Sequence, residues 1–455
     1  MNIIKMKPIK VILMLFALSL STAISKAQTV QLSLKDALKY ALENNQNVRK
    51  ARLDIEGGKY KTSEIKAQAL PQINGSASLT DNLIIQKSAI PNIFQGKPDE
   101  IILVPFGQQW NANASVQLSQ QLFNQSVFTG LKAAKVGEDF YNLNASLTEE
   151  NLLQQIAAAY YQILINRQNL AVIDTNINSL VRIEKTVGTQ YKNGLARKID
   201  LDRVRVNLTN LRNERQQLAN GVTQQENALK YYMGMPINTI IEIPEAAVTQ
   251  ITTDANMLSE TLNVDELTEY QLIQKQEQLL NLQKKAYQAE YFPSLSLTSS
   301  YLYSGLSNKL DLFKRNSTAN WNDAATIGLS LRIPLFDGNA RKSRVKQADV
   351  ELQKAKEDLK NTSQALNLAY DNAQLQIRNS INTINSQKEN VRLAEEVYSS
   401  TQNNYKNGLA SLTDLLDAEN SLTEAKNSYN QALLNYRVAE IQLIKSNGNI
   451  KSLLD

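Results

Sequence analysis

Two reactive residue types are missing: the 455 residues contain neither cysteine nor histidine. The absence of cysteine excludes disulfides, thiolate metal sites, cysteine nucleophiles and lipid-modified cysteines. The absence of histidine removes the commonest general base and the commonest transition-metal ligand. Carboxylate or lysine chemistry stays open, but most hydrolase and redox mechanisms are excluded. We therefore expect no enzyme, no catalytic residue, no metal and no cofactor.

Long hydrophobic runs are also lacking, except near the start of the chain. A positive segment, an apolar run and a small-x-small cleavage pattern follow one another there: Lys5, Lys7 and Lys10, then Val11–Leu20, then Ser25–Ala27. This order predicts an export signal over residues 1–27. A membrane anchor is the alternative, but the run is too short to cross a bilayer comfortably. After residue 28 no run approaches about twenty residues, so we expect no membrane helix in the mature chain.

An excess of one charge is missing as well. The 49 lysines and arginines against 44 aspartates and glutamates give a formal charge of +5, but four of those lysines lie in the export signal. The remaining chain is nearly neutral, which gives no support to a nucleic-acid partner.

The hexapeptide YKNGLA occurs twice, at residues 191–196 and 405–410. Aligning the two copies also aligns other residues in the same order: Asp200 with Asp414, Leu201 with Leu415, Leu208 with Leu422, and Thr209 with Thr423. One shared hexapeptide could arise by chance, but an ordered series predicts a tandem duplication. We expect a first repeat at 28–236, a linker at 237–262, a second repeat at 263–447 and a tail at 448–455.

Both repeats predict the same order of elements: a helix, two strands, a long helix, the YKNGLA turn and a second long helix. Ser33 is a suitable N-cap for the first helix, and Val264–Glu290 is its counterpart in the second repeat. The long helices, predicted at about 125–190 and 338–404, carry apolar residues at spacings of three, four or seven. This spacing favours helices that pack side by side as a coiled coil.

Period-two alternation marks two strands in each repeat, joined by predicted loops at 89–107 and 307–322. The apolar series are Ile73, Gly75, Ala77 and Leu79; Trp110, Ala112, Ala114, Val116 and Leu118; Leu295, Leu297, Tyr301 and Tyr303; and Ile327, Leu329, Leu331, Ile333 and Leu335. Ordinary hairpins on a core are one interpretation. Polar faces with few charges, and aromatic residues near the strand ends, favour a transmembrane β-barrel with its apolar face toward lipid. Four strands cannot close a barrel, so a barrel requires an oligomer.

On this duplicated order, and on the segments YKNGLARKIDLDRV and YKNGLASLTDLLDAENSLTEA, the chain resembles the TolC-like outer-membrane factor family of efflux and type I secretion ducts. The resemblance covers essentially the whole mature chain. It implies a mainly α fold with a small β-barrel. In the implied homotrimer, long coiled-coil helices form an α-barrel tube, and four strands per chain form a twelve-stranded transmembrane barrel. The linker and the C-terminal segment would form an equatorial belt.

The same resemblance implies a passive channel in the outer membrane of a Gram-negative bacterium, surrounded by lipid and extended through the periplasm. It would serve a tripartite efflux or type I secretion system, with a periplasmic adaptor protein and an inner-membrane pump as partners. The polar strand faces do not identify the transported substrate. A barrel-anchored trimeric coiled-coil protein with a structural or adhesive role is one rival, against which the duplicated turns argue. A secreted helical-repeat enzyme is the other, against which the missing histidine and cysteine argue.

Within this resemblance, the second turn implies a gate at the periplasmic entrance. Asp414 and Asp417, one helical turn apart, would form acidic rings in the trimer that attract cations and repel anions. Tyr405 would help to tie the tips shut, with Asp200 as its partner inside the subunit. The alternative is that Asp414 only caps the last helix and Asp417 only complements its dipole. Ala410 stands where relatives often carry an arginine, so that part of their latch is missing.

The two turns also imply a docking surface for the adaptor, formed by Gly194 and Leu195 in the first turn and by Gly408 and Leu409 in the second. Glycine permits the tight reversal between helices, and an exposed leucine offers an apolar contact. The alternative is a turn glycine followed by a leucine that packs locally.

Overall fold

The computed structural model describes residues 30–93, 96–244 and 262–454. The predicted export signal at 1–27 and most of the predicted linker, residues 245–261, lie outside the described residues. The chain divides into two compact units. Of the described residues, the helical unit comprises 30–50, 147–244, 262–264 and 365–454, and the sheet unit comprises 51–93, 96–146 and 265–364.

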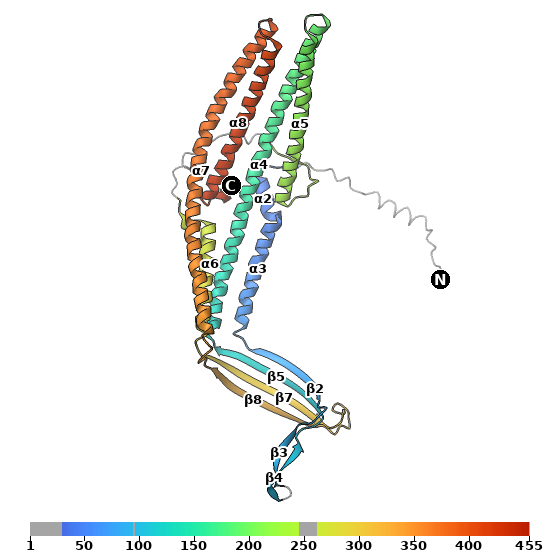
Figure 1. Cartoon of the computed structure of the whole chain (residues 1–455), viewed down its shortest axis with the longest axis vertical. Helices are drawn as coiled ribbons and strands as arrows, with labels where there is room; N and C mark the ends of the chain where they lie inside the picture. Colours follow the sequence, from blue (N-terminus) through green and yellow to red (C-terminus); the bar gives the residue numbers. More distant parts are fainter. Residues whose placement is uncertain (1–29, 94–95, 245–261, 455) are drawn as a thin grey trace, which may run out of the picture. The chain divides into compact units, whose positions relative to one another are not determined.

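The sheet unit contains four antiparallel strands in the order β2–β5–β7–β8 (Figure 1). Their bounds are Gln72–Asp81 for β2, Trp110–Phe123 for β5, Ser294–Ser307 for β7 and Asn320–Arg332 for β8. The central pairing joins the two predicted repeats, because β5 pairs with β7 along nearly its whole length. Strands β2 and β8 are the edges, and within the described ranges no further strand pairs with either of them. Each edge therefore presents a row of backbone groups that can accept another strand.

The register places most of the apolar residues of the four strands on one face of the sheet, with Leu302 and Leu306 as exceptions. Cross-strand pairs on this face include Gly75↔Val116, Val116↔Tyr301, Leu297↔Leu329 and Leu295↔Leu331. Much of the face is open in the single chain, where Ile327 is 77% exposed and Leu329 is 67% exposed. A contiguous apolar face of this kind marks a surface that contacts lipid or another protein.

The opposite face of the sheet is polar. On it, the hydroxyl groups of Ser76 and Ser115 lie 2.8 Å apart on the neighbouring strands β2 and β5. The predicted alternation is therefore confirmed in all four strands. One end differs, because Pro334 lacks the N–H that a β-ladder needs, and β8 stops before it. Ile333 and Leu335 consequently lie outside the strand.

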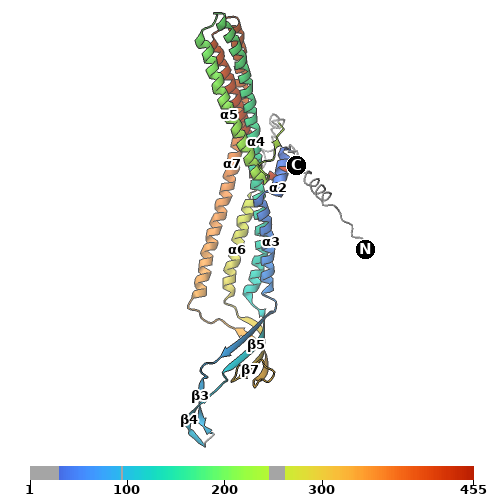
Figure 2. The ribbon, with the colours of Figure 1, turned by 90° about the vertical axis from the view of Figure 1, so that its right-hand side faces the viewer.

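One of the two predicted loops is wrong. Residues 89–107 largely form an antiparallel hairpin of β3, Lys87–Asn92, and β4, Lys97–Pro105. Alternation of apolar and polar residues does not reveal its two strands, because both of their faces are rich in apolar residues. The backbone N–H of Asn82 donates to the carbonyl of Gln109 (2.7 Å), which ties the base of this insertion to β2 and β5. Figures 1 and 2 show the hairpin extending past the ends of these two strands.

Four helical segments complete the sheet unit. They are α6 (Thr268–Ala289) and the parts of α3 (Gln46–Ala67), α4 (Gln125–Lys192) and α7 (Ala340–Lys406) that fall in this unit. Ion pairs join them, from Lys275 to Asp139 (2.8 Å) and from Lys284 to Asp349 (2.6 Å). The two long helices agree with their predicted bounds to within two residues. In the described parts of the chain, no helix combines the length and the apolar character that a membrane crossing requires.

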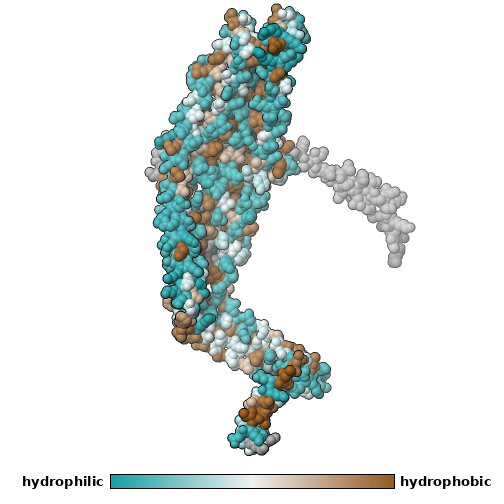
Figure 3. All heavy atoms as spheres, in the orientation of Figure 1, coloured by the Kyte–Doolittle hydropathy of each residue, from teal (hydrophilic) through white to brown (hydrophobic). Residues whose placement is uncertain are grey.

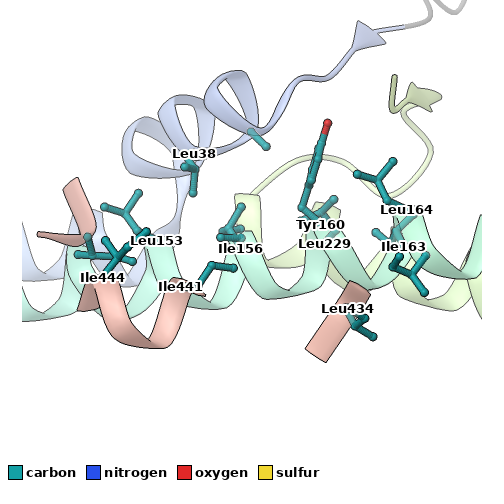
Figure 4. Packing of buried hydrophobic residues seen from close by; sticks show 14 of the residues in the cluster. Leu38, Leu153, Ile156, Tyr160, Ile163, Leu164, Leu229, Leu434, Ile441 and Ile444 are labelled. Carbon is teal, nitrogen blue, oxygen red and sulfur yellow. The ribbon is translucent and has the colours of Figure 1, made fainter. Parts of the chain in front are cut away.

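The helical unit has its main core where α2 (Leu34–Asn44), α4, α5 (Lys198–Met233) and α8 (Leu412–Ser446) come together. Figure 4 shows Leu38 of α2, Ile156 of α4 and Leu229 of α5 in this cluster. The buried Tyr160 donates its hydroxyl to the carbonyl of Leu32 (3.0 Å), so its polar end is satisfied. Burial raises the pKa of Tyr160 to about 12.

Two short elements close this core. Strand β1 (Val30–Gln31) pairs in parallel with β6 (Ile241–Glu242), and the 3-10 helix η5 (Ile450–Leu454) buries Ile450 in the same cluster. The predicted N-cap is confirmed, because the Ser33 side chain accepts a hydrogen bond from the N–H of Asp36 (3.1 Å).

The first predicted helix is in fact two helices, broken at Asn45. The Asn45 side-chain oxygen accepts from the N–H of Asn47 (2.8 Å) and caps α3, while its amide nitrogen donates to the carbonyl of Tyr232 (2.6 Å). Gly234, which ends α5, lies against this break, and a Cβ there would come within 2.4 Å of the Asn44 oxygen. The break is therefore fixed by a tertiary contact that the sequence periodicity does not reveal.

Candidate gate and docking tips

The two YKNGLA segments form the same turn, one after α4 and one after α7. Each ends its helix with a Schellman motif, in which two N–H groups beyond the helix donate to its last carbonyls. The four bonds are Gly194 N to Tyr191 O (3.0 Å), Leu195 N to Gln190 O (2.8 Å), Gly408 N to Tyr405 O (3.0 Å) and Leu409 N to Asn404 O (2.8 Å). The repeated sequence therefore produces the same reversal of the chain twice.

Both turns require glycine and present leucine. Gly194 and Gly408 each have a φ of +74°, a left-handed conformation that costs other residues about 1–2 kcal/mol. No atom lies within 4 Å of a Cβ built on either glycine, so conformation rather than crowding selects the residue. Leu195 is 79% exposed and Leu409 is 78% exposed, so neither leucine packs locally.

Asp414 forms a capping box with Ser411 at the start of α8. Its Oδ2 accepts from the backbone N–H (2.9 Å) and the hydroxyl (2.8 Å) of Ser411, whose Oγ in turn accepts from the N–H of Asp414 (3.2 Å). The hydrogen bond from the Ser411 hydroxyl, followed by that from its backbone, holds the pKa of Asp414 below its ordinary value. The cap predicted as an alternative role is present, and it keeps the carboxylate charged.

Asp200 occupies the matching position of the first tip but has a different partner. Arg197 replaces the capping serine, and its guanidinium donates to Asp200 from Nε (3.0 Å) and Nη2 (3.1 Å). This hydrogen-bonded pair lowers the pKa of Asp200. Because the Arg197 side chain is 79% exposed, solvent screens the pair and its contribution to stability is small. The first tip thus holds a paired carboxylate, whereas hydroxyl and amide groups hold Asp414.

The other two predicted gate residues flank these positions. Asp417 is exposed in the next turn of α8, so both predicted gate carboxylates lie at the end of α8 nearest the tip. Tyr405 is half-buried in the last turn of α7, where burial and then the charge of Asp200 raise its pKa. Tyr405 also packs against the apolar cluster that contains Leu201, the sequence neighbour of Asp200. The arrangement can present negative charge beside a partly buried tyrosine.

A small apolar cluster joins the two tips. Its buried members are Leu180, Ile183 and Val187 of α4, Leu201, Val204 and Leu208 of α5, and Leu412, Leu415 and Leu416 of α8. A hydrogen bond of 2.6 Å from Arg203 Nη1 to Thr413 Oγ1 links the second turn of α5 to the first turn of α8 beside it. An arginine of the first tip thus contacts the second, although position 410 is alanine. No local sequence pattern predicts this contact between residues 210 positions apart.

A partly open cavity of about 360 Å³, lined by apolar as well as polar side chains, lies between α4, α7 and α8, next to the apolar cluster. Glu419, which is 5% exposed, and Asn176, which is 6% exposed, line it. Among the described residues, Glu419 Oε2 and Asn176 Oδ1 have no hydrogen-bond partner. Burial raises the pKa of Glu419, and this effect is partly opposed by a hydrogen bond from Ser179 and by the charge of Arg182.

The sequence carried a sign of this buried carboxylate. Glu419 follows Leu415 by four positions and Leu416 by three, which places it on the buried face of α8. The amide of Asn176 on α4 donates to Thr423 Oγ1 (2.8 Å), and Ser179 Oγ lies 3.0 Å from the hydroxyl of Tyr398 on α7. These bonds join three helices around a group whose charge depends on pH.

Comparison with known sequences identifies relatives of the whole chain. The sequence model described as Outer membrane efflux protein matches residues 37–235 and 269–449. Outer membrane protein TolC of Salmonella enteritidis is 24% identical over 452 residues, which cover 96% of this chain and 86% of that protein. Cation efflux system protein CusC of Escherichia coli O157:H7 is 24% identical over 433 residues, which cover 91% of this chain and 85% of that protein.

Solved structures agree on the fold. VceC, an outer membrane protein of Vibrio cholerae, superposes with a TM-score of 0.73 at 18% identity, covering 91% of this chain and 96% of VceC. A CusC structure gives a TM-score of 0.71 at 19% identity and covers 92% of each chain. The long helices and the four-stranded antiparallel sheet are thus the fold of these outer-membrane channels. Because the family's sequence model also matches most of the chain, the protein belongs to the Outer membrane efflux protein family, the TolC-like family that its repeated turns resemble.

Proposed function

We propose that the protein is the outer-membrane duct of a tripartite export system, a passive homotrimer gated at its two YKNGLA tips. Membership of the Outer membrane efflux protein family makes it an outer-membrane transport protein rather than an enzyme. The trimer, the gate and the partner proteins are the proposal. It applies to the chain after removal of the predicted signal at 1–27.

The observation that carries the proposal is the sheet. Each copy offers one polar face, one apolar face and two edge strands, β2 and β8, that are open in the single chain. Three copies joined from β2 to β8 close twelve strands into a barrel without free edges. The apolar face then contacts lipid and the Asn, Ser, Thr and Gln side chains line the lumen. If the strands were ordinary hairpins packed on a core of the single chain, Ile327 and Leu329 would be buried. They are instead 77% and 67% exposed.

The tips support a gate and a docking surface. Asp414 is held charged by its cap, and Asp417 is exposed one turn further on, so three copies around an axis form two acidic rings. Capping and gating use the same carboxylate and do not compete. Exposed Leu195 and Leu409 provide apolar contacts for a periplasmic adaptor, through which an inner-membrane pump supplies the energy. Tyr405 and Asp200 would stabilise the closed tips.

Ion selectivity in planar bilayers tests this function. Asp414→Asn combined with Asp417→Asn removes the ring charges, while Ser411 stays as the N-cap of α8 and the side-chain oxygen of an asparagine at 414 can still accept from the Ser411 N–H. We expect the reversal potential in a salt gradient to move from cation-selective toward nonselective. Ser411→Ala is the matched control, because it removes the serine side of the cap and leaves both carboxylates. An unchanged reversal potential in the double variant, or the same shift in the control, contradicts the acidic gate.

A further inference from the structure

The β3–β4 insertion carries an apolar surface that the single chain leaves open. We call this the hairpin surface and define it by residues with large exposed fractions: Leu83 (87%), Ile84 (91%), Ile101 (74%), Leu103 (66%) and Phe106 (67%). Figure 3 shows hydrophobic atoms over this hairpin. An isolated two-stranded hairpin is marginally stable in water, so a surface of this kind requires a cover.

The sheet pairing indicates what lies beside the hairpin surface. The hairpin begins after Asp81, the last residue of edge strand β2, which pairs with Trp110. Trp110 pairs in turn with Ser307, the last residue of β7, and Leu306 pairs with Asn320, the first residue of β8. The hairpin and the β7–β8 loop, residues 308–319, therefore emerge from the same end of the sheet. When β2 of one copy joins β8 of the next, the next copy's loop comes beside the hairpin.

The β7–β8 loop has a fixed shape with apolar residues turned outward. Asp311 accepts hydrogen bonds from the Ser307 hydroxyl (2.7 Å) and from the N–H and hydroxyl of Thr318 (3.0 Å each). These bonds, with that from Ser307 the largest cause, lower the pKa of Asp311 to about 2. Leu312 is buried, whereas Phe313 is 76% exposed. The loop thus presents an aromatic side chain on a well-anchored turn.

The hairpin carries charges of both signs, and its two acids are complementary in sign to the basic residues of the loop: the hairpin has Lys87, Lys97, Asp99 and Glu100. Asp99 and Glu100 are exposed at the start of β4, near the tip of the hairpin. The loop exposes Lys309, Lys314 and Arg315, while its one acid, Asp311, is turned into the loop by its own hydrogen bonds. Opposite charges at the rim of an apolar contact favour one orientation of the two partners.

We propose that the hairpin surface of each copy packs on the β7–β8 loop of the next copy, so that three such contacts form a collar at this end of the barrel. The collar rests on the proposed trimer and extends its β2–β8 seam beyond the strands. It places Leu103 next to Phe313 of the neighbouring copy, and it places Asp99 and Glu100 next to the basic residues of that loop.

Disulfide cross-linking tests the collar against a clean background, because the chain has no cysteine of its own. In Leu103→Cys combined with Phe313→Cys, mild oxidation should give covalent dimers and trimers on non-reducing gels. Each single variant should stay monomeric on the same gels. Leu103→Cys combined with Ile327→Cys is the matched control, because Ile327 lies mid-strand on the apolar face. Monomers only in the first pair, or equal cross-linking in the control, overturn the collar.

A charge exchange tests the orientation. Asp99→Lys with Glu100→Lys should lower the yield of the Leu103–Phe313 cross-link about threefold to fivefold, and adding Lys314→Glu with Arg315→Glu should restore it. Equal yields in all three backgrounds contradict the charge contact.

The mass of the detergent-solubilised protein separates failure of the collar from failure of the duct. A trimer without the cross-link overturns the collar and leaves the proposed function standing, whereas a monomer overturns both. A nitroxide spin label attached to the cysteine of Leu103→Cys reports directly whether the hairpin surface is covered. Shielding from both oxygen and a water-soluble paramagnetic reagent supports the collar, and accessibility to oxygen alone assigns the surface to lipid and overturns it.

Discussion

The buried carboxylate of Glu419 should make the tips sensitive to pH. Burial raises its pKa, so the folded chain binds this proton more tightly than the unfolded chain does. The stability that protonated Glu419 contributes is fully present below the pKa of an unfolded glutamate and is lost as pH rises through the folded pKa. Glu419→Gln imitates the protonated form at every pH, and it places an amide donor in the cavity that the unsatisfied oxygen of Asn176 also lines.

The size of the effect follows from the two unpaired acceptors. Leaving a buried polar group unsatisfied costs about 1–3 kcal/mol, so Glu419→Gln should stabilise the tips by about that amount at neutral pH. Since 1.4 kcal/mol is a factor of ten in an equilibrium, amide exchange around the cavity should slow by about fivefold to 150-fold. At a pH below the pKa of an unfolded glutamate, the wild type and the Glu419→Gln variant should exchange at the same rate.

Hydrogen–deuterium exchange measured by mass spectrometry is the assay, on peptides that cover 170–190 and 412–430. Wild type and variant are compared at the same pH, which removes the intrinsic pH dependence of exchange. Glu424→Gln is the matched control, because Glu424 is exposed on the same helix. A variant that exchanges faster than wild type at neutral pH, or a difference that does not grow with pH, refutes the reasoning.

Three further predictions concern the tips. Gly408→Ala should destabilise the second turn by about 1–2 kcal/mol through its positive φ, seen as faster exchange there, whereas an unchanged rate would mean that the turn relaxes without strain. Ser411→Ala should cost about 1 kcal/mol by removing a cap, measured as faster exchange at the start of α8; unaltered protection contradicts the capping box. Arg203→Ala should loosen the contact with Thr413 and raise the open probability of single channels, and a lower open probability would contradict a closing role.

Local sequence rules predicted the regular parts of the fold well. The long helices follow from apolar residues spaced three and four apart, and the four strands follow from alternation of apolar and polar residues. The two turns follow from Gly194 and Gly408, which take a left-handed conformation that other residues avoid. These features depend on residues close together in the sequence. The exposed positions of Leu195 and Leu409 also match the docking hypothesis, although their contact with an adaptor stays a prediction.

The features that the sequence did not reveal depend on distant contacts. Asn45 breaks a helix because Tyr232 and Gly234 meet it from the end of α5. The β3–β4 hairpin lacks a polar face, so alternation gave no warning of it. The spacing of Glu419 from the leucines of α8 indicates that it is buried, but only the fold brings Asn176 into the same cavity.

Single-channel recording of the purified protein in a planar bilayer tests the central claim most directly, because a passive gated duct must conduct without an energy source. The account predicts discrete openings that favour cations, and a loss of that preference when Asp414 and Asp417 are both replaced by Asn. A protein that is silent in the bilayer, and stays silent with Asp414→Ala and Asp417→Ala, would contradict it.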